Sequence, residues 1–220
     1  MSRERRSFTG PQAIAAAFDV SRESIDRLEA YADLLLRWQS RINLIGRATG
    51  GQIWHRHIAD CLQALPLIPE DAPTLVDVGS GAGLPGMVLA IALGDTGPAV
   101  HLIESNTKKV AFLREAVRVT GVKAAIHPIR VEEFDSQALH APAGVVTARA
   151  FAPLPRLLTS IHHLFDQGTL ALLWKGQDVD KELTDSAKYW RIHHDRFPSA
   201  TDATGVILRI HEVRRVSEQD

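Results

Sequence analysis

The residues best suited to bind a ligand lie in one glycine-rich segment, residues 76–86. Its apolar start, Val76-Asp77-Val78, predicts a strand, and its glycines allow a tight turn and a close approach of the backbone to a ligand. Pro85 suits the first turn of a following helix. This order is typical of nucleotide-binding proteins. Two interpretations stay open here, because residues 81–86 match a dinucleotide pattern and the glycines at 79, 81 and 83 match a loop for S-adenosylmethionine (SAM).

Two further apolar runs end in residues that fit a nucleoside. Residues 99–104 end at Glu104, about 20 residues after the loop, where a carboxylate can accept hydrogen bonds from the ribose hydroxyls. Residues 124–129 lead to Val131 and Glu132, which would bring a backbone amide and a carboxylate to the adenine edge. This third position favours SAM. The cofactor-binding residues predicted from these strand ends are Gly79, Gly81, Gly83, Leu84, Glu104, Ser105, Asn106, Val131 and Glu132.

Six short blocks occur in order along the chain and carry a resemblance to a known family. They are Asn43-Leu44-Ile45, Arg56-His57-Ile58-Ala59-Asp60, Asp77 to Gly86, Arg130-Val131-Glu132-Glu133-Phe134, Arg149-Ala150-Phe151-Ala152 and Lys175-Gly176. On these blocks the chain resembles the RsmG (GidB) family of bacterial 16S rRNA guanine-N7 methyltransferases, over roughly residues 20 to 210. Two departures are mild: Cys61 replaces an expected serine, and Glu104 stands where the family often has aspartate.

The resemblance implies a SAM-dependent methyltransferase that modifies N7 of guanine 527 in 16S rRNA, within a 30S subunit or an assembly intermediate. It assigns Arg149 to the cofactor, although an ion pair with Asp77 is an alternative. Guanine N7 presents a free lone pair, so positioning of the base and the methyl group dominates over base catalysis. Candidates for holding the guanine are Arg149, Lys175 and His57, and for His57 we favour instead a hydrogen bond with Asp60 that fixes the helical extension.

We expect an α/β class I methyltransferase domain, Rossmann-like, with a mostly parallel sheet and a final antiparallel hairpin. We expect a partly flexible tail at residues 1–20, a helical extension at 21–72, the SAM-binding domain at 73–216 and a tail at 217–220. Ser21 caps a predicted helix that runs to residue 41, residues 43–51 form a loop, and a second helix covers residues 53–65. Asn106 caps a later helix that ends at Gly121. Residues 189–197 and 206–210 form the hairpin.

Composition and charge bear on the number of domains and on contact with RNA. The chain has 220 residues, is 45% hydrophobic and has a formal net charge of −1, which suits one globular domain. Between residues 34 and 59 it has four arginines and no acid, a stretch that either contacts RNA phosphates or forms an ordinary solvated helix face. The residues predicted to bind RNA are Arg37, Arg41, Arg47, Arg56, Lys108 and Lys109.

The single cysteine, Cys61, excludes an intrachain disulfide and suits a reducing compartment, so we expect a cytoplasmic protein. The sequence contains no run of 18 apolar residues, so we expect no membrane-spanning helix. The pairs His162-His163 and His193-His194 lack metal-ligand spacing, so we expect no metal. We also expect a monomer. Two other functions remain as alternatives: a nicotinamide-dependent oxidoreductase, which would lack a second substrate domain, and a SAM-binding module without turnover.

Overall fold

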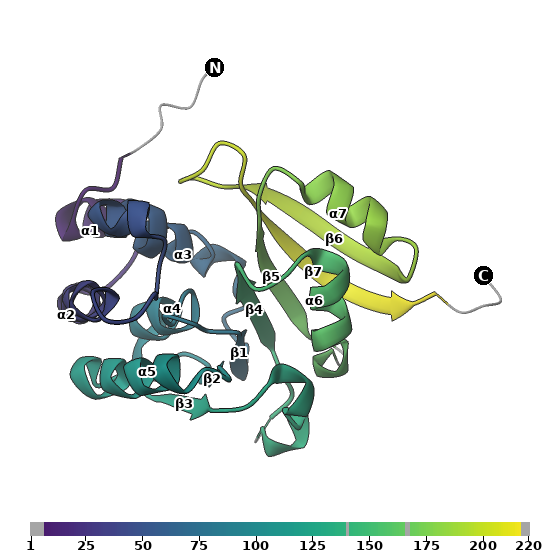
Figure 1. The fold of residues 1–220 in the computed structure, drawn as a ribbon, viewed down its shortest axis with the longest axis horizontal. Helices are drawn as coiled ribbons and strands as arrows, with labels where there is room; N and C mark the ends of the chain where they lie inside the picture. Colours follow the sequence, from purple (N-terminus) through teal and green to yellow (C-terminus); the bar gives the residue numbers. More distant parts are fainter. Residues whose placement is uncertain (1–6, 140, 166–167, 217–220) are drawn as a thin grey trace.

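The computed structural model describes residues 7–139, 141–165 and 168–216. Its centre is a seven-stranded sheet with the strand order β3-β2-β1-β4-β5-β7-β6 (Figure 1). The first five strands pair in parallel, and β7 runs antiparallel to both β5 and β6. The predicted mostly parallel sheet with an antiparallel carboxyl-terminal hairpin is therefore confirmed. The strands are β1 (Thr74–Val78), β2 (Ala99–Ile103), β3 (Ala124–His127), β4 (Val145–Arg149), β5 (Leu170–Lys175), β6 (Trp190–Pro198) and β7 (Val206–Arg215).

The helices lie on both faces of the sheet (Figure 1). One face carries α4 and α5, and the helical extension packs on the outside of these two helices through ring contacts such as Tyr31 and Trp38 with Phe112. The other face carries α6 and α7, which enclose a second apolar cluster. The α-helices are α1 (Pro11–Ala17), α2 (Arg22–Gln39), α3 (Asp60–Leu62), α4 (Gly86–Leu93), α5 (Thr107–Thr120), α6 (Leu154–Ile161) and α7 (Val179–Ser186).

Short helical turns join these elements. The segment η2 (Trp54–Ala59) is a π-helix, a form often found at functional sites. The others are 3₁₀ turns: η1 (Arg47–Gln52), η3 (Leu65–Leu67), η4 (Gly94–Thr96), η5 (Val131–Glu133), η6 (Ser136–Ala138) and η7 (His162–Leu164). Among the residues that the structure describes, no helix combines the length and apolar character needed to cross a bilayer.

The predicted helix caps are present. The Ser21 hydroxyl accepts a hydrogen bond from the Ser24 amide at 3.0 Å, and α2 follows directly. Asn106 accepts from the amides of Lys108 and Lys109 at the start of α5, and Gly121 ends that helix at a φ of 66°. Both boundaries follow from local chemistry, because a side-chain oxygen satisfies amides that the first turn leaves free and glycine adopts the left-handed conformation without a Cβ clash.

One expectation for the amino-terminal part needs correction. Residues 7–20 are not a tail over their whole length, because α1 forms there and buries Phe8 and Ile14 completely or nearly so against the extension. Pro11 at the first turn and the alanine-rich segment that follows are the local signals for this helix. The second predicted helix, at 53–65, is present in its larger part, because residues 53–62 are helical without a break through the π-helix η2 and the short α3, and the 3₁₀ turn η3 follows.

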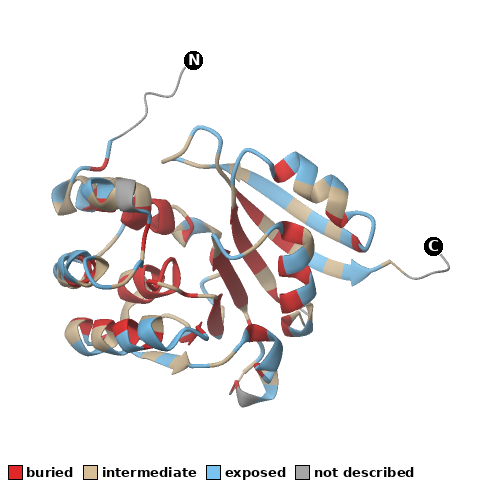
Figure 2. Cartoon of the chain, in the orientation of Figure 1, coloured by how far each residue is buried: buried red, intermediate tan, exposed pale blue. Residues whose placement is uncertain are grey.

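Burial follows the sheet. The central strands are buried, whereas along the outer strand β6 only Trp190 is buried and the other positions are half-buried or exposed (Figure 2). Equivalent strand ends lie side by side, since Val78 pairs with Ile103 and Arg149 pairs with Trp174. The loops after β1, β2, β3 and β4 consequently open onto the same edge of the sheet, which is where open α/β sheets bind ligands.

Candidate functional site

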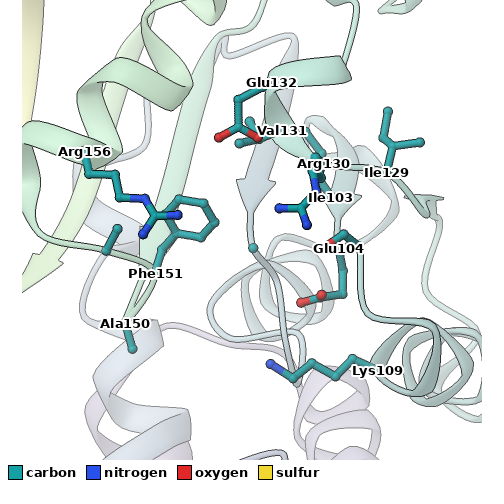
Figure 3. Close-up of a pocket in the computed structure, with 13 residues that line it drawn as sticks. Ile103, Glu104, Lys109, Ile129, Arg130, Val131, Glu132, Ala150, Phe151 and Arg156 are labelled. Atoms are coloured by element: carbon teal, nitrogen blue, oxygen red, sulfur yellow. The ribbon is translucent and has the colours of Figure 1, made fainter.

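Two adjoining cavities open at this edge, with volumes of about 300 Å³ and about 430 Å³. They share Gly79, Lys109 and Ala150. The first, shown in Figure 3, is lined by Gly79, Ile103, Glu104, Ser105, Lys109, Ile129, Arg130, Val131, Glu132, Ala150, Phe151, Ala152 and Arg156. The second is lined by Asn43, Leu44, Ile45, Gly46, His57, Gly79, Ser80, Gly81, Ala82, Leu84, Lys109, Arg149 and Ala150. Both volumes lie in the range of small-molecule sites.

The glycines of the loop have different tasks. A Cβ at Gly83 would lie 2.5 Å from Met87 Cγ, and one at Gly86 would lie 2.6 Å from an Asp77 carboxylate oxygen. These two glycines allow the loop and α4 to pack closely against their neighbours, and Gly83 is not among the residues that line either cavity. Its predicted contact with the methionine part of SAM finds no support in this geometry.

Gly81 faces the ligand space. Its φ is +58°, and a Cβ there would lie no closer than 3.7 Å to any protein atom, the nearest being a backbone oxygen of Gly79 and the next the ammonium of Lys109 at 3.9 Å. A side chain at this position would therefore extend into the second cavity without striking the protein. The loop is further held from outside, because the buried Tyr31 hydroxyl donates to the Ala82 carbonyl at 2.6 Å.

Glu104 is a buried carboxylate, 7% exposed, at the end of β2. Its two oxygens accept hydrogen bonds from the amides of Gly81 at 2.9 Å and Asn106 at 2.7 Å, so it joins the glycine loop to the start of α5. A carboxylate has about four acceptor positions, and the remaining ones are available to ribose hydroxyls in the first cavity. Ser105 also lines this cavity, whereas the Asn106 side chain caps α5 and lies outside both cavities.

The third predicted position, after β3, lies at the far end of the first cavity from Lys109 (Figure 3). Val131 is buried there, and Glu132 is exposed. The Ser160 hydroxyl donates to a Glu132 carboxylate oxygen at 2.6 Å, and this hydrogen bond holds the pKa of Glu132 below its usual value. Glu132 is therefore ionised and ready to accept a hydrogen bond from an amino group.

Arg149, at the end of β4, connects the sheet to the helical extension. Its Nε donates to the Asp60 carboxylate at 2.8 Å, and its terminal nitrogens reach the Arg56 carbonyl at 2.7 Å and His57 Nδ1 at 3.3 Å. The expected alternatives need correction here. Asp77 is not its partner, and His57 and Asp60 do not bond to each other, because Arg149 lies between them and binds both. Arg149 also lines the second cavity.

His57 is neutral at physiological pH. Burial, followed by the nearby charges of Arg149 and Arg56, lowers its pKa from 6.5 to about 4. Since Nδ1 accepts from Arg149, the proton is on Nε2, which donates to the Thr49 hydroxyl at 2.8 Å. One ring nitrogen thus joins η2 to Arg149 at the end of β4 and the other joins it to η1, and His57 also lines the second cavity.

Asp77 instead supports the glycine loop from inside the fold. It is fully buried, and it accepts from the Thr147 hydroxyl at 2.8 Å and from the Gly86 amide at 3.1 Å. Its pKa is raised to about 6, because burial outweighs the effect of these hydrogen bonds.

Lys175 does not face either cavity. Its side chain is 6% exposed, and its ammonium binds Glu182 at 2.5 Å and the Ala152 carbonyl at 3.0 Å. It supports the cavity wall through Ala152, and we do not propose that it holds the guanine. The residues of the first cavity that the sequence reasoning missed include Arg130, Phe151 and Arg156. The first two lie inside the family blocks, which was the available signal, whereas Arg156 on α6 carried none.

The family model described as rRNA small subunit methyltransferase G, GidB, matches residues 24–205. The chain belongs to the GidB family. It is 47% identical over 205 residues to a protein of Rhodospirillum rubrum named ribosomal RNA small subunit methyltransferase G, covering 93% of this chain and 98% of that protein. A protein of the same name from Rhodospirillum centenum is 48% identical over 198 residues, covering 90% of this chain and 88% of that protein.

Solved structures of low sequence identity support the fold. The O-methyltransferase TomG of Streptomyces achromogenes, solved in complex with SAM, is 14% identical with a TM-score of 0.55, covering 96% of this chain and 99% of that chain. The glycopeptide N-methyltransferase MtfA, also solved with SAM, is 12% identical with a TM-score of 0.52, covering 70% of this chain and 93% of that chain. The fold is that of class I SAM-dependent methyltransferases, as predicted. The open face of Gly81 and the buried Glu104 fit SAM as the cofactor.

Proposed function

We propose that this member of the GidB family transfers the methyl group of SAM to N7 of a guanine in 16S rRNA, with guanine 527 of the 30S subunit as its target. The observation that carries the proposal is the pair of adjoining cavities along the glycine loop. The first contains Glu104, Val131 and Glu132, which suit a nucleoside, and the second adjoins it through Gly79, Lys109 and Ala150. The first fits the cofactor's adenosine, and the second leaves room for the target base.

The chain's own residues bind and position the reactants. Glu104 and Glu132 offer carboxylate oxygens for the ribose and the adenine amino group, and the bare backbone at Gly81 leaves space for the methionine part. SAM supplies a methyl group on a positively charged sulfur. Because N7 attacks with a lone pair that carries no proton, no residue has to act as a base. Holding the two reactants in line supplies about 7 kcal/mol or more.

Lysine and arginine side chains around the cavities can contact the phosphates of the RNA. Lys109, Arg130 and Arg156 line the first cavity, and Lys108 is exposed at the start of α5 beside it. Arg37 and Arg41 are exposed around the end of α2, and Arg41 lies two positions before Asn43, which lines the second cavity. Both arginines remain in the proposal. Arg56 is a weaker candidate, because it pairs with Asp202 at 3.2 Å and its backbone carbonyl binds Arg149. The side chain of Arg47 lies outside the described residues.

The target guanine must leave its stack to enter the second cavity, so we propose an unpaired loop of 16S rRNA as the element recognised. We propose that a single chain of this size reads little RNA sequence on its own. We therefore propose that the folded 30S particle, through its phosphate positions, provides the remaining specificity.

The proposal is tested with labelled SAM and 30S particles from cells that lack this gene. We expect label in 16S rRNA with the wild-type protein and no detectable binding of NAD by calorimetry. An Arg37→Gln/Arg41→Gln/Lys108→Gln variant should keep its affinity for SAM and bind 30S particles with less salt dependence, by somewhat under one unit of log–log slope for each lost phosphate contact. Arg191→Gln, on the exposed outer strand β6, is the matched control.

Binding of SAM without any transfer of label would instead favour a binding module. Unchanged salt dependence in the triple variant would show that RNA approaches by another surface.

A further inference from the structure

Phe151 holds an unusual position for an apolar residue. It follows β4 and Arg149, and 38% of it is exposed. The residue before it, Ala150, has a φ of +52° and is the single non-glycine residue with positive φ among those that the structure describes. Residues with a side chain rarely adopt this conformation, and such strain concentrates at functional sites. The backbone is thus bent in the turn that brings the Phe151 ring to the cavity.

The ring lies against the glycine loop at the junction of the two cavities. A Cβ at Gly79 would be 2.2 Å from Phe151 Cδ2 and 2.8 Å from Cε2, so only glycine leaves room for the ring there. Phe151 lines the first cavity, and its two contacts at the junction, Ala150 and Gly79, line both. Figure 3 shows the ring across the cavity from Glu104 and well apart from Ile129.

Two other large apolar side chains are exposed among the described residues, Leu36 and Tyr189, and neither lines either cavity. A planar apolar ring at the entrance of a nucleotide cavity is suited to stack on a base, and stacking on an aromatic side chain is how proteins hold bases that have left their own stack.

We propose that the target guanine enters through the second cavity and reaches past Gly79 and Ala150, which both cavities share, to stack on the Phe151 ring at the near end of the first cavity. This positioning role rests on the proposed function. The adenine of the cofactor has its polar partners at Val131 and Glu132, at the far end of the first cavity, whereas the methyl group must reach the second. Stacking contacts only the face of the guanine, so the N7 lone pair, which lies in the ring plane, stays free to attack. The ring thereby fixes the plane of the nucleophile without competing for it.

The experiment compares Phe151→Ala, Phe151→Leu and Phe151→Tyr in the full-length protein, with labelled SAM and 30S particles as the substrates. For the alanine and leucine variants we expect kcat/KM for 30S particles to fall about tenfold or more, which is the scale of one lost base–aromatic stack, while the Kd for SAM changes less than about twofold. Tyr keeps the aromatic face, so Phe151→Tyr should restore most of the activity. Leu keeps the apolar contact with Gly79 and so separates packing from stacking.

Tyr189→Ala removes an aromatic ring that is 63% exposed and remote from the cavities, and it should leave every parameter unchanged. The proposal is overturned if Phe151→Leu matches the wild type, or if the Kd for SAM rises as far as kcat/KM falls, which would place the ring on the adenine. If the wild-type protein transfers no methyl group to 30S particles, the proposed function itself is refuted. The same assay separates the two outcomes, because the wild type tests the function and the variants test the role of Phe151.

Discussion

Removal of the Asp60 carboxylate should destabilise the fold strongly, because this group joins three segments of the chain. Its side chain is 11% exposed and pairs with Arg149, whose side chain is 19% exposed, at 2.8 Å. The same carboxylate accepts from the Thr201 hydroxyl at 2.6 Å and the Gln63 amide at 2.8 Å. Asp60→Ala leaves the Arg149 guanidinium without its counter-charge, and removal of one partner of a buried ion pair costs about 3 to 5 kcal/mol.

For a chain of this size each kcal/mol lowers the melting temperature by about 2 to 4 °C. Since both side chains keep some contact with solvent, we take the lower limit of about 3 kcal/mol, equivalent to a fall of about 6 to 12 °C. Urea unfolding followed by circular dichroism measures the free energy, and a thermal melt measures the temperature.

Asp95→Ala is the matched control. Asp95 pairs with Lys123 at 3.7 Å, and the two side chains are 53% and 79% exposed, so the loss should stay within about 1 kcal/mol. The double variant Asp60→Ala/Arg149→Ala should be less destabilised than the sum of the two single variants, because the unpaired charge is gone. A loss for Asp60→Ala no larger than that of Asp95→Ala would refute this reasoning.

Three further predictions concern the loop and the histidine. Glu104→Ala should weaken SAM binding, measured by calorimetry, by about 1 to 3 kcal/mol, because ribose hydroxyls and two loop amides lose their acceptor; unchanged affinity would remove this residue from the site. Gly81→Ala should abolish binding while folding is retained, and Gly121→Ala, at a φ of 66° with open space around it, is the control for backbone strain. Acidification from pH 7 to pH 5 should destabilise the wild type by about 2 kcal/mol through His57, because its pKa falls from 6.5 unfolded to about 4 folded and the unfolded chain takes up the proton first. Asp77 opposes this change, because its raised pKa of about 6 adds stability as the pH falls. The test is therefore the difference in pH dependence between the wild type and His57→Gln. Equal pH dependence of the two proteins would contradict the lowered pKa of His57.

The position of the site could be predicted because it depends on local patterns and one topological rule. Apolar runs that end at Glu104, Val131 and Arg149 predict parallel strands, and the ends of parallel strands meet at one edge of a sheet. The caps at Ser21 and Asn106 were predictable for the same local reason. The family blocks added the identity of the cofactor.

The partners of the predicted residues could not be derived in this way. Arg149 and Asp60 are 89 positions apart, and their pairing depends on how the extension docks, for which the sequence holds no local signal. The different roles of Gly79, Gly81 and Gly83 likewise depend on which side chains pack against each glycine. Gly83 packs against Met87 and does not line a cavity. Lys175 ends a strand as predicted, yet its charge is satisfied by Glu182 on the helix that follows.

The most direct test of the central claim is to map N7-methylguanosine in 16S rRNA by mass spectrometry, in cells with the gene, without it, and with the gene for Gly81→Ala restored. We expect one N7-methylguanosine, at position 527, that is present with the wild-type gene and absent in the other two strains. An unchanged methylation pattern in the strain without the gene would contradict the proposed function.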